Sequence, residues 1–235
     1  MDLREPKFPE IPLKEGQEIS EWYPIWEKIQ TDYQLIRFYE TEKQELVLTL
    51  DTFVQFIEGE NEQMYHKTLV EPALAINPDA KKILILGGGD GLAARTIFQH
   101  KPDADITLVE LDGEMIKLFK THPRLRKMNE ESLPKCTLYI ENALHWVLRN
   151  APKSFDIIIC DFPDPTNQTL KKLYKQSFLE EVAYLLAPNG VVSIQCNVEI
   201  TSQVDNIIKE ILGSSAVIEY EMPCPDCGTM VIGRK

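Results

Sequence analysis

The chain has 235 residues, of which 43% are hydrophobic and 26% are charged, so a wholly disordered chain is excluded and a sizeable core is expected. Its net charge of −12 argues against a protein that follows nucleic-acid phosphates, which would need a basic surface. An acidic chain can instead bind cationic small molecules, although many proteins are acidic for solubility alone.

The N-terminal third is expected to hold an arm and a small β domain. Residues 1–18 are charged and rich in proline, which predicts an extended arm without the apolar segment of a signal peptide. Residues 33–59 alternate polar and apolar side chains, which predicts two or three short antiparallel strands. A helical spacing of apolar residues follows over 61–76. We therefore expect a first domain over residues 1–76.

From residue 81 onward, short apolar strands alternate with helices, which predicts a parallel sheet covered on both faces. We expect an α/β fold, with a Rossmann-like domain of the class I methyltransferase type over residues 77–235. The expected strands are 82–86, 106–111, 137–140, 156–160 and 191–196, with a closing hairpin from 216–221 and 229–233. The expected helices are 92–100, 113–120, 142–149, 168–186 and 201–212. No apolar run is long enough for a transmembrane helix.

The chain has five cysteines, an odd number, and three of them are scattered in apolar runs, which is typical of buried reduced thiols in the cytoplasm. Cys224 and Cys227 have the spacing of half a zinc site, but no second pair accompanies them. We therefore favour a turn with two packed thiols over a metal or redox site.

The first chemical motif is the run GGGDG at residues 87–91, which follows an expected buried strand and opens an expected helix. Glycines at this place allow a tight turn and let a ligand approach the backbone at the helix N-terminus. Glu110 ends the next expected strand, where its carboxylate can accept both ribose hydroxyls of a nucleoside. Asp90 would repel a pyrophosphate, so a sulfonium nucleoside fits better than a dinucleotide. The alternative is that Asp90 simply caps the helix.

The second motif is DFPDP at residues 161–165, where the expected strand 156–160 ends. Its carboxylates, Asp161 and Asp164, lie three residues apart in a loop that two prolines stiffen. This pair suits amine transfer, because a cationic amine must lose a proton before its nitrogen can attack. One carboxylate can accept that proton while the other holds the ammonium chain. The alternative is a turn with an Asx cap, which Asp-Pro sequences often form.

With both motifs in place, the chain resembles the spermidine synthase, or polyamine aminopropyltransferase, family over about residues 31–196. The resemblance lies in Tyr33-Gln34, DTFVQFIE (51–58), Tyr65-His66, ILILGGGDG, TLVELD, FDIIICDFPDP and LYKQSF. It implies transfer of an aminopropyl group from decarboxylated S-adenosylmethionine to an amine, with putrescine as the favoured acceptor and methylthioadenosine released. It further implies a cytoplasmic homodimer with no metal, no bound cofactor and no nucleic-acid or membrane partner.

The resemblance also implies roles for single residues. Asp161 would be the catalytic base, Asp90 would hold the aminopropyl amine, and Glu110 would take the ribose hydroxyls. The donor site would contain Gln34, His66, Gly87, Gly88, Gly89, Asp90, Glu110, Asn142 and Ala143. The acceptor site would contain Gln55, Tyr65 and Asp164, with Tyr174 as a further candidate.

The chain departs from the family pattern in several places. Asn142 stands where an aspartate usually accepts the adenine amino group, and its amide oxygen can still accept. Phe162 stands in a loop that usually reads DSSDP, and we expect it to narrow or reshape the acceptor pocket. The segment after Glu58 is one residue longer than usual, and the C-terminal PCPDCGTMVIGRK lacks the usual aromatic residue.

Two other functions remain open. One is a methyltransferase that uses intact S-adenosylmethionine, which Asp90 and Asp164 disfavour. The other is a non-catalytic relative that binds a polyamine or a nucleoside, which Asp161 disfavours.

Overall fold

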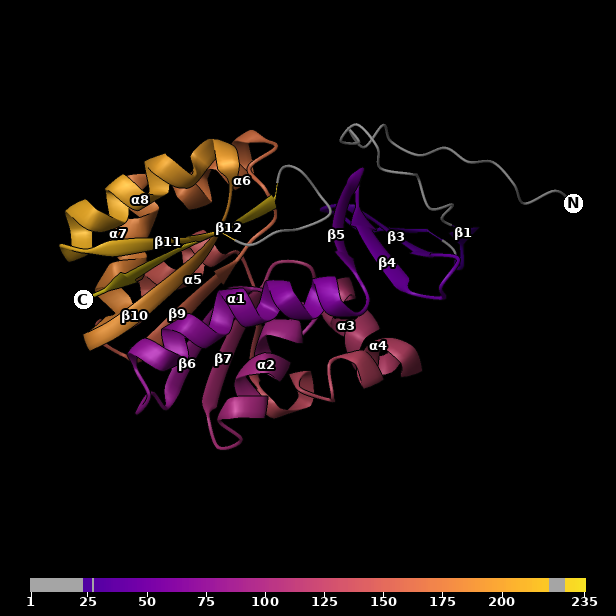
Figure 1. Cartoon of the computed structure of the whole chain (residues 1–235), viewed down its shortest axis with the longest axis horizontal. Helices are drawn as coiled ribbons and strands as arrows, with labels where there is room; N and C mark the ends of the chain where they lie inside the picture. Colours follow the sequence, from indigo (N-terminus) through magenta and orange to yellow (C-terminus); the bar gives the residue numbers. More distant parts are fainter. Residues whose placement is uncertain (1–22, 27, 220–226) are drawn as a thin grey trace, which may run out of the picture. The chain divides into compact units, whose positions relative to one another are not determined.

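The computed structural model describes residues 23–26, 28–219 and 227–235 (Figure 1). The predicted arm over 1–18, Cys224 and the side chain of Cys227 lie outside the described residues. The described chain falls into two compact units, one up to Met64 and the other from Tyr65 to 219 and from 228 to 235.

The first unit contains a five-stranded antiparallel sheet in which Ile36 and Phe38 are buried while the residues between and beside them are not. This period of two is the pattern that predicted strands over 33–59, and the prediction is confirmed. The turn at Asp51 is left-handed, and its carboxylate accepts from the Leu35 N–H at 2.9 Å. The strands are β1 (Tyr23–Pro24), β2 (Ile29–Gln30), β3 (Leu35–Glu40), β4 (Leu46–Leu50) and β5 (Phe53–Ile57), with both β2 and β1 pairing β3.

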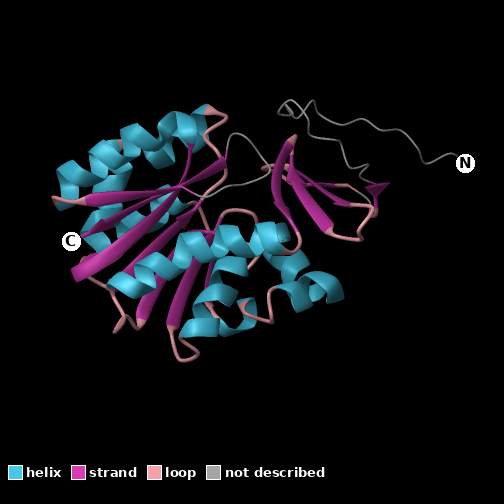
Figure 2. Ribbon diagram, in the orientation of Figure 1, coloured by secondary structure: helices cyan, strands magenta, loops and turns pink. Residues whose placement is uncertain are grey.

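The second unit is built on a seven-stranded mixed sheet with the order β11-β12-β10-β9-β6-β7-β8. Figure 2 shows helices of this unit lying against its strands. β10, β9, β6, β7 and β8 pair in parallel, and β11 and β12 form the predicted antiparallel closing hairpin. The predicted α/β fold is therefore confirmed. The strands are β6 (Lys82–Gly87), β7 (Asp105–Glu110), β8 (Thr137–Ile140), β9 (Phe155–Asp161), β10 (Leu186–Asn197), β11 (Ser215–Glu219) and β12 (Cys227–Arg234).

Helices cover the sheet because its central strands are apolar on both faces. Trp146, Phe178 and Ile208, which lie on helices, pack with strand residues in one buried cluster. The hydroxyl of Ser193, on β10, donates to the backbone carbonyl of Leu69, on the helix over Glu60–Ile76. The helices are α1 (Glu60–Ile76), α2 (Leu92–His100), α3 (Gly113–Thr121), α4 (Pro123–Met128), α5 (Ala143–Arg149), α6 (Gln168–Lys171), α7 (Gln176–Leu185) and α8 (Val198–Leu212), with short 3-10 helices η1 (Leu133–Lys135) and η2 (Lys172–Tyr174). Among the described residues, none of these helices has both the length and the apolarity to cross a membrane.

The single helix predicted over 168–186 is wrong. The chain instead forms α6, η2 and α7, because Lys175 adopts an extended conformation between η2 and α7. This break turns Leu173 and Tyr174 into the core, where both are buried. The helices α4 and η1 over residues 123–135 were not predicted, since that stretch is mostly polar.

The strand order reverses at β6. The chain runs from β6 outward to β7 and β8, and then returns to place β9 on the other side of β6. In open α/β sheets, ligands bind beyond the carboxyl ends of the strands at such a reversal. Gly87 and Asp161 are paired at these ends of β6 and β9, so both chemical motifs meet there.

Candidate functional site

The glycine loop is held against the end of β9. Gly87 and Gly88 have φ of 85° and 66°, which favour glycine, and the Gly88 N–H donates to the Asp161 carbonyl at 3.2 Å. A Cβ on Gly87 would lie 2.1 Å from that same carbonyl oxygen. These glycines are therefore required by the close approach of the loop to the backbone of β9, and the predicted approach of a ligand stays a prediction.

Replacing Gly87 with alanine is expected to destabilise the protein by about 3 kcal/mol or more, since it adds a backbone clash to a left-handed φ. Gly213 is the matched control, because its φ is 84° but nothing lies within 4 Å of its Cβ position. The Gly213→Ala variant should lose about 1–2 kcal/mol. Urea unfolding measures both variants, and equal losses would contradict the clash.

Three side chains gather above the glycine loop. His66, Asp90 and Asp161 each offer a ligand atom, and these atoms lie within 4.8 Å of one another. His66 is buried, and its ring stands edge-on to the Tyr65 ring with centroids 4.8 Å apart. The Tyr65 hydroxyl donates to Asp161 Oδ1 at 2.6 Å, which fixes that carboxylate. Such a group can hold a metal ion or an organic cation.

Asp90 serves two purposes in this arrangement. Its Oδ1 accepts from the Leu92 N–H at 2.9 Å and so satisfies the first backbone donor of α2, while the N-cap residue itself is Gly91. Its carboxylate also belongs to the cluster with His66 and Asp161. Asn129, which is fully buried, donates to the Asp90 carbonyl at 3.0 Å and holds the loop backbone in place. The contact of Asp90 with the start of α2 is therefore compatible with a role in the site.

Glu110 ends β7 as predicted, and backbone groups hold its carboxylate. Oε2 accepts from the Gly89 N–H at 3.1 Å, and Oε1 accepts from the Asp112 N–H at 2.8 Å. A Cβ on Gly89 would lie 2.7–2.9 Å from the Glu110 side chain, so glycine leaves this carboxylate its space. Burial raises the pKa of Glu110 to about 7, against the lowering effect of these N–H donors.

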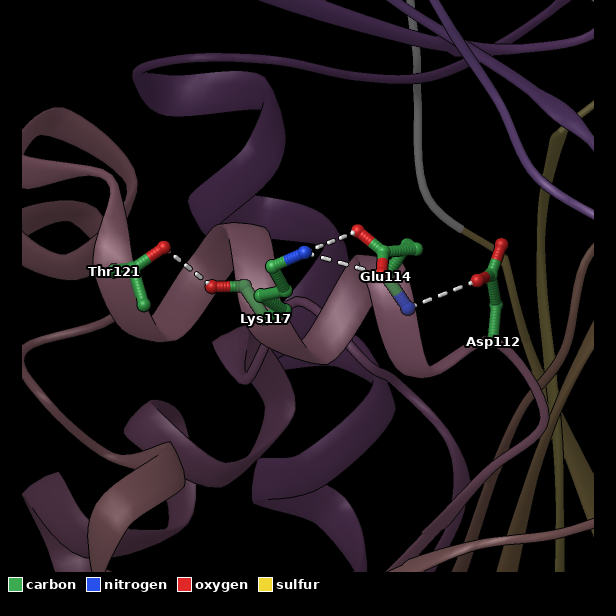
Figure 3. Close-up of polar contacts among 4 residues, drawn as sticks. All are labelled: Asp112, Glu114, Lys117 and Thr121. Atoms are coloured by element: carbon green, nitrogen blue, oxygen red, sulfur yellow. Dashed lines mark hydrogen bonds and ion pairs between the residues drawn. The ribbon is translucent and has the colours of Figure 1, made fainter.

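Asp112 ties Glu110 to the start of α3. Its side chain accepts from the Glu114 N–H at 3.1 Å and caps the helix (Figure 3). Further along the helix, Lys117 pairs with Glu114 at 3.0 Å, and the Thr121 hydroxyl donates to the Lys117 carbonyl at 2.8 Å. The negative charge of Asp112 also contributes to the raised pKa of Glu110.

Asp164 accepts a hydrogen bond from Gln195, a residue that the sequence analysis did not identify as a candidate. Gln195 Nε2 donates to Asp164 Oδ1 at 3.0 Å, and the Tyr174 hydroxyl donates to Gln195 Oε1 at 3.1 Å. Tyr174 is 2% exposed, so it acts from inside the core. The available signal in the sequence was a polar residue, Gln195, within the apolar run VVSIQC. In the structure, Ile194 pairs with Cys160, and this pairing places Gln195 near the end of β9.

Phe162, which we expected to narrow or reshape the acceptor pocket, packs in the core, and its effect on the acceptor stays a prediction. Its side chain is 7% exposed and belongs to the core, where its ring lies 6.4 Å from Tyr174 and 6.0 Å from Phe178 between centroids. Successive residues along an extended chain point to opposite faces. With Asp161 turned toward Tyr65, Phe162 is turned into the core.

The remaining predicted residues are placed as follows. Asn142 caps α5 through Oδ1, which accepts from the Leu144 N–H at 2.9 Å, and Ala143 is the first residue of that helix. Both residues follow β8, whose last residue, Ile140, pairs with Glu110 at the end of β7. Gln34 and Gln55 belong to the first unit, where Gln55 lies on β5. The roles of all four stay predictions.

The chain is similar to known proteins over most of its length. Residues 62–224 match the family profile described as spermine/spermidine synthase domain. A polyamine aminopropyltransferase of Leptospira interrogans is 43% identical over 168 residues, which cover 71% of this chain and 33% of that protein. This chain therefore spans about a third of that relative's length.

Two solved structures support the fold. A crystal structure of a spermidine synthase in complex with the transition-state analogue AdoDATO has a TM-score of 0.80 and 24% identity, covering 92% of this chain and 75% of that one. The crystal structure of the spermidine synthase from Thermotoga maritima has a TM-score of 0.77 and 23% identity, covering 92% and 74%.

Proposed function

The chain belongs to the spermine/spermidine synthase family, and from that premise we propose that it transfers an aminopropyl group from decarboxylated S-adenosylmethionine to an amine. We propose putrescine as the acceptor, which gives spermidine and releases methylthioadenosine. The observation that carries the proposal is the cluster of His66, Asp90 and Asp161 at the carboxyl ends of β6 and β9. Two carboxylates there suit a reaction whose donor and acceptor are both cations.

The donor would bind along the ends of β6, β7 and β8. Glu110 would accept the ribose hydroxyls, and Asp90 would hold the ammonium end of the aminopropyl chain. Asn142 and Ala143, which follow the strand next to β7, would contact the adenine. His66 would complete the donor site within this unit.

The acceptor amine would attack from the side of Asp161. Its nitrogen lone pair forms a bond to the methylene carbon next to the sulfonium, the C–S bond breaks, and its electron pair stays on sulfur as a neutral thioether. The ammonium proton that must leave first goes to Asp161, which Tyr65 holds at 2.6 Å. Asp164 and Tyr65 would hold the rest of the amine. Alignment of the two reactants supplies much of the acceleration.

A direct assay tests the proposal. The purified chain is mixed with decarboxylated S-adenosylmethionine and putrescine, cadaverine, agmatine or spermidine, and methylthioadenosine is followed by chromatography. We expect methylthioadenosine to form, and to form fastest with putrescine among these amines. No product with any amine would contradict the proposal. A methylated product from intact S-adenosylmethionine would favour a methyltransferase, and binding without turnover would favour a non-catalytic relative.

Donor-site affinity should rise with pH, because ribose hydroxyls donate to the ionised form of Glu110. With a pKa of about 7, the carboxylate is mostly protonated at pH 6 and mostly ionised at pH 8. Methylthioadenosine, which lacks the amine, should bind about tenfold more tightly at pH 8 than at pH 6. The Glu110→Gln variant should bind it more weakly and equally at both values. Calorimetry measures both affinities, and an unchanged slope in the variant would exclude Glu110 as the titrating group.

We also propose that the protein acts as a cytoplasmic homodimer. Cys160 and Cys196 are buried free thiols, which suits a reducing compartment. The dimer rests on the family resemblance alone. Light scattering after gel filtration tests it, and a monomer at micromolar concentration would contradict it.

A further inference from the structure

Asp164 is connected to the core by a chain of two hydrogen bonds. Gln195 on β10 donates to the carboxylate at 3.0 Å, and the Tyr174 hydroxyl donates to Gln195 at 3.1 Å. The same hydroxyl lies 3.3 Å from the Pro163 carbonyl oxygen and 3.5 Å from that of Phe162. The Tyr174 hydroxyl therefore lies beside the backbone of the DFPDP loop and also contacts Gln195, the residue that donates to Asp164.

The chemistry of these groups fixes the direction of each bond. A carboxylate only accepts, so the Gln195 amide must present its NH₂ group to Asp164 and its oxygen to Tyr174. A protonated tyrosine hydroxyl can donate to that oxygen. Burial raises the pKa of Tyr174 well above its usual value, with nearby cysteines and aspartates adding to the effect, so the hydroxyl stays protonated. Gln195 is 5% exposed and cannot easily turn over.

The position of Tyr174 depends on the break between η2 and α7. Its ring meets Phe162 edge-on with centroids 6.4 Å apart, and Phe162 in turn packs against Phe178. These aromatic contacts hold the ring whether or not a hydroxyl is present. The hydroxyl can therefore be removed without emptying the core.

We propose that Tyr174 and Gln195 are positioning residues that orient the Asp164 carboxylate for the acceptor amine. The inference rests on the proposed function. It adds that the buried side chains of Tyr174 and Gln195 set the affinity for the acceptor amine and do not affect the affinity for the donor. Without the hydroxyl, the Gln195 amide oxygen loses its donor, so the glutamine that donates to Asp164 is held less firmly.

Tyr174→Phe is the central test. The Michaelis constant for putrescine should rise about tenfold, the effect of one lost buried hydrogen bond, while the donor's Michaelis constant changes less than twofold. Tyr184→Phe is the matched control, because Tyr184 lies on α7 with 55% of its surface exposed. That variant should match the wild type. Equal changes in both Michaelis constants, or none in Tyr174→Phe, would overturn the proposal.

A double-mutant cycle separates positioning from general stability. In an Asp164→Asn background, Tyr174→Phe should have less than a twofold further effect on the putrescine constant, since its target is already altered. A full tenfold effect in that background would overturn the proposal. An inactive wild type would overturn the proposed function and this inference together, whereas an active wild type with an unaffected Tyr174→Phe variant would overturn this inference alone.

Discussion

Replacing Asp161 with asparagine is expected to lower kcat about a thousandfold, within the range of general base catalysis, while donor affinity changes less than about threefold. Asparagine keeps the shape of the side chain and an oxygen that can accept from the Tyr65 hydroxyl. It cannot take a proton from the acceptor ammonium. The loss should therefore fall on the chemical step. Single-turnover rates and donor calorimetry measure the two quantities separately.

The matched control is Asp156→Asn, which makes the same change at the other end of β9. Asp156 accepts from the Lys81 and Lys82 backbone N–H groups at 2.8 and 2.9 Å, which an asparagine oxygen can also do. Its activity should remain within twofold of the wild type. Equal losses of turnover and donor affinity in Asp161→Asn would instead show that Asp161 holds the ligands and is not the base.

The sheet was predictable because its strands are short apolar runs between turn signals. KILIL, ITLVEL and DIIIC each became a central strand, and the glycine run then had one possible place, at the carboxyl end of the first of them. The pairing of Gly87 with Asp161 follows from strand order, since β9 returns beside β6. Strand periodicity therefore placed each motif at the end of a strand, whereas the meeting of the two motifs depends on a strand order that the sequence analysis did not predict.

What could not be predicted depends on which way single side chains turn. Phe162 sits between two site carboxylates in the sequence, yet its ring is in the core. Gln195 sits in an apolar run, yet its amide contacts Asp164. The break at Lys175 has no glycine or proline to signal it. Each outcome is decided by packing between segments distant in the sequence, which local patterns do not record.

Replacing Asp90 with asparagine is expected to reduce the preference for the decarboxylated donor over intact S-adenosylmethionine by about thirtyfold or more. In the proposed complex, the Asp90 carboxylate attracts the donor's ammonium group and repels the carboxylate that intact S-adenosylmethionine still carries. One such charge pair is worth about 2 kcal/mol in a partly solvated site. Neutralising Asp90 should therefore weaken binding of the decarboxylated donor and leave the intact donor unchanged or tighter.

The Asp90→Asn variant should keep the backbone conformation of the glycine loop. Asparagine can still accept from the Leu92 N–H, so the start of α2 keeps this hydrogen bond, and Asn129 still donates to the backbone of residue 90. Methylthioadenosine serves as the ligand control, because it has the nucleoside but not the aminopropyl chain. Its affinity should change less than twofold in Asp90→Asn. If methylthioadenosine lost as much affinity as the decarboxylated donor, Asp90 would be shaping the loop, and the charge of this cluster would not be what selects the donor.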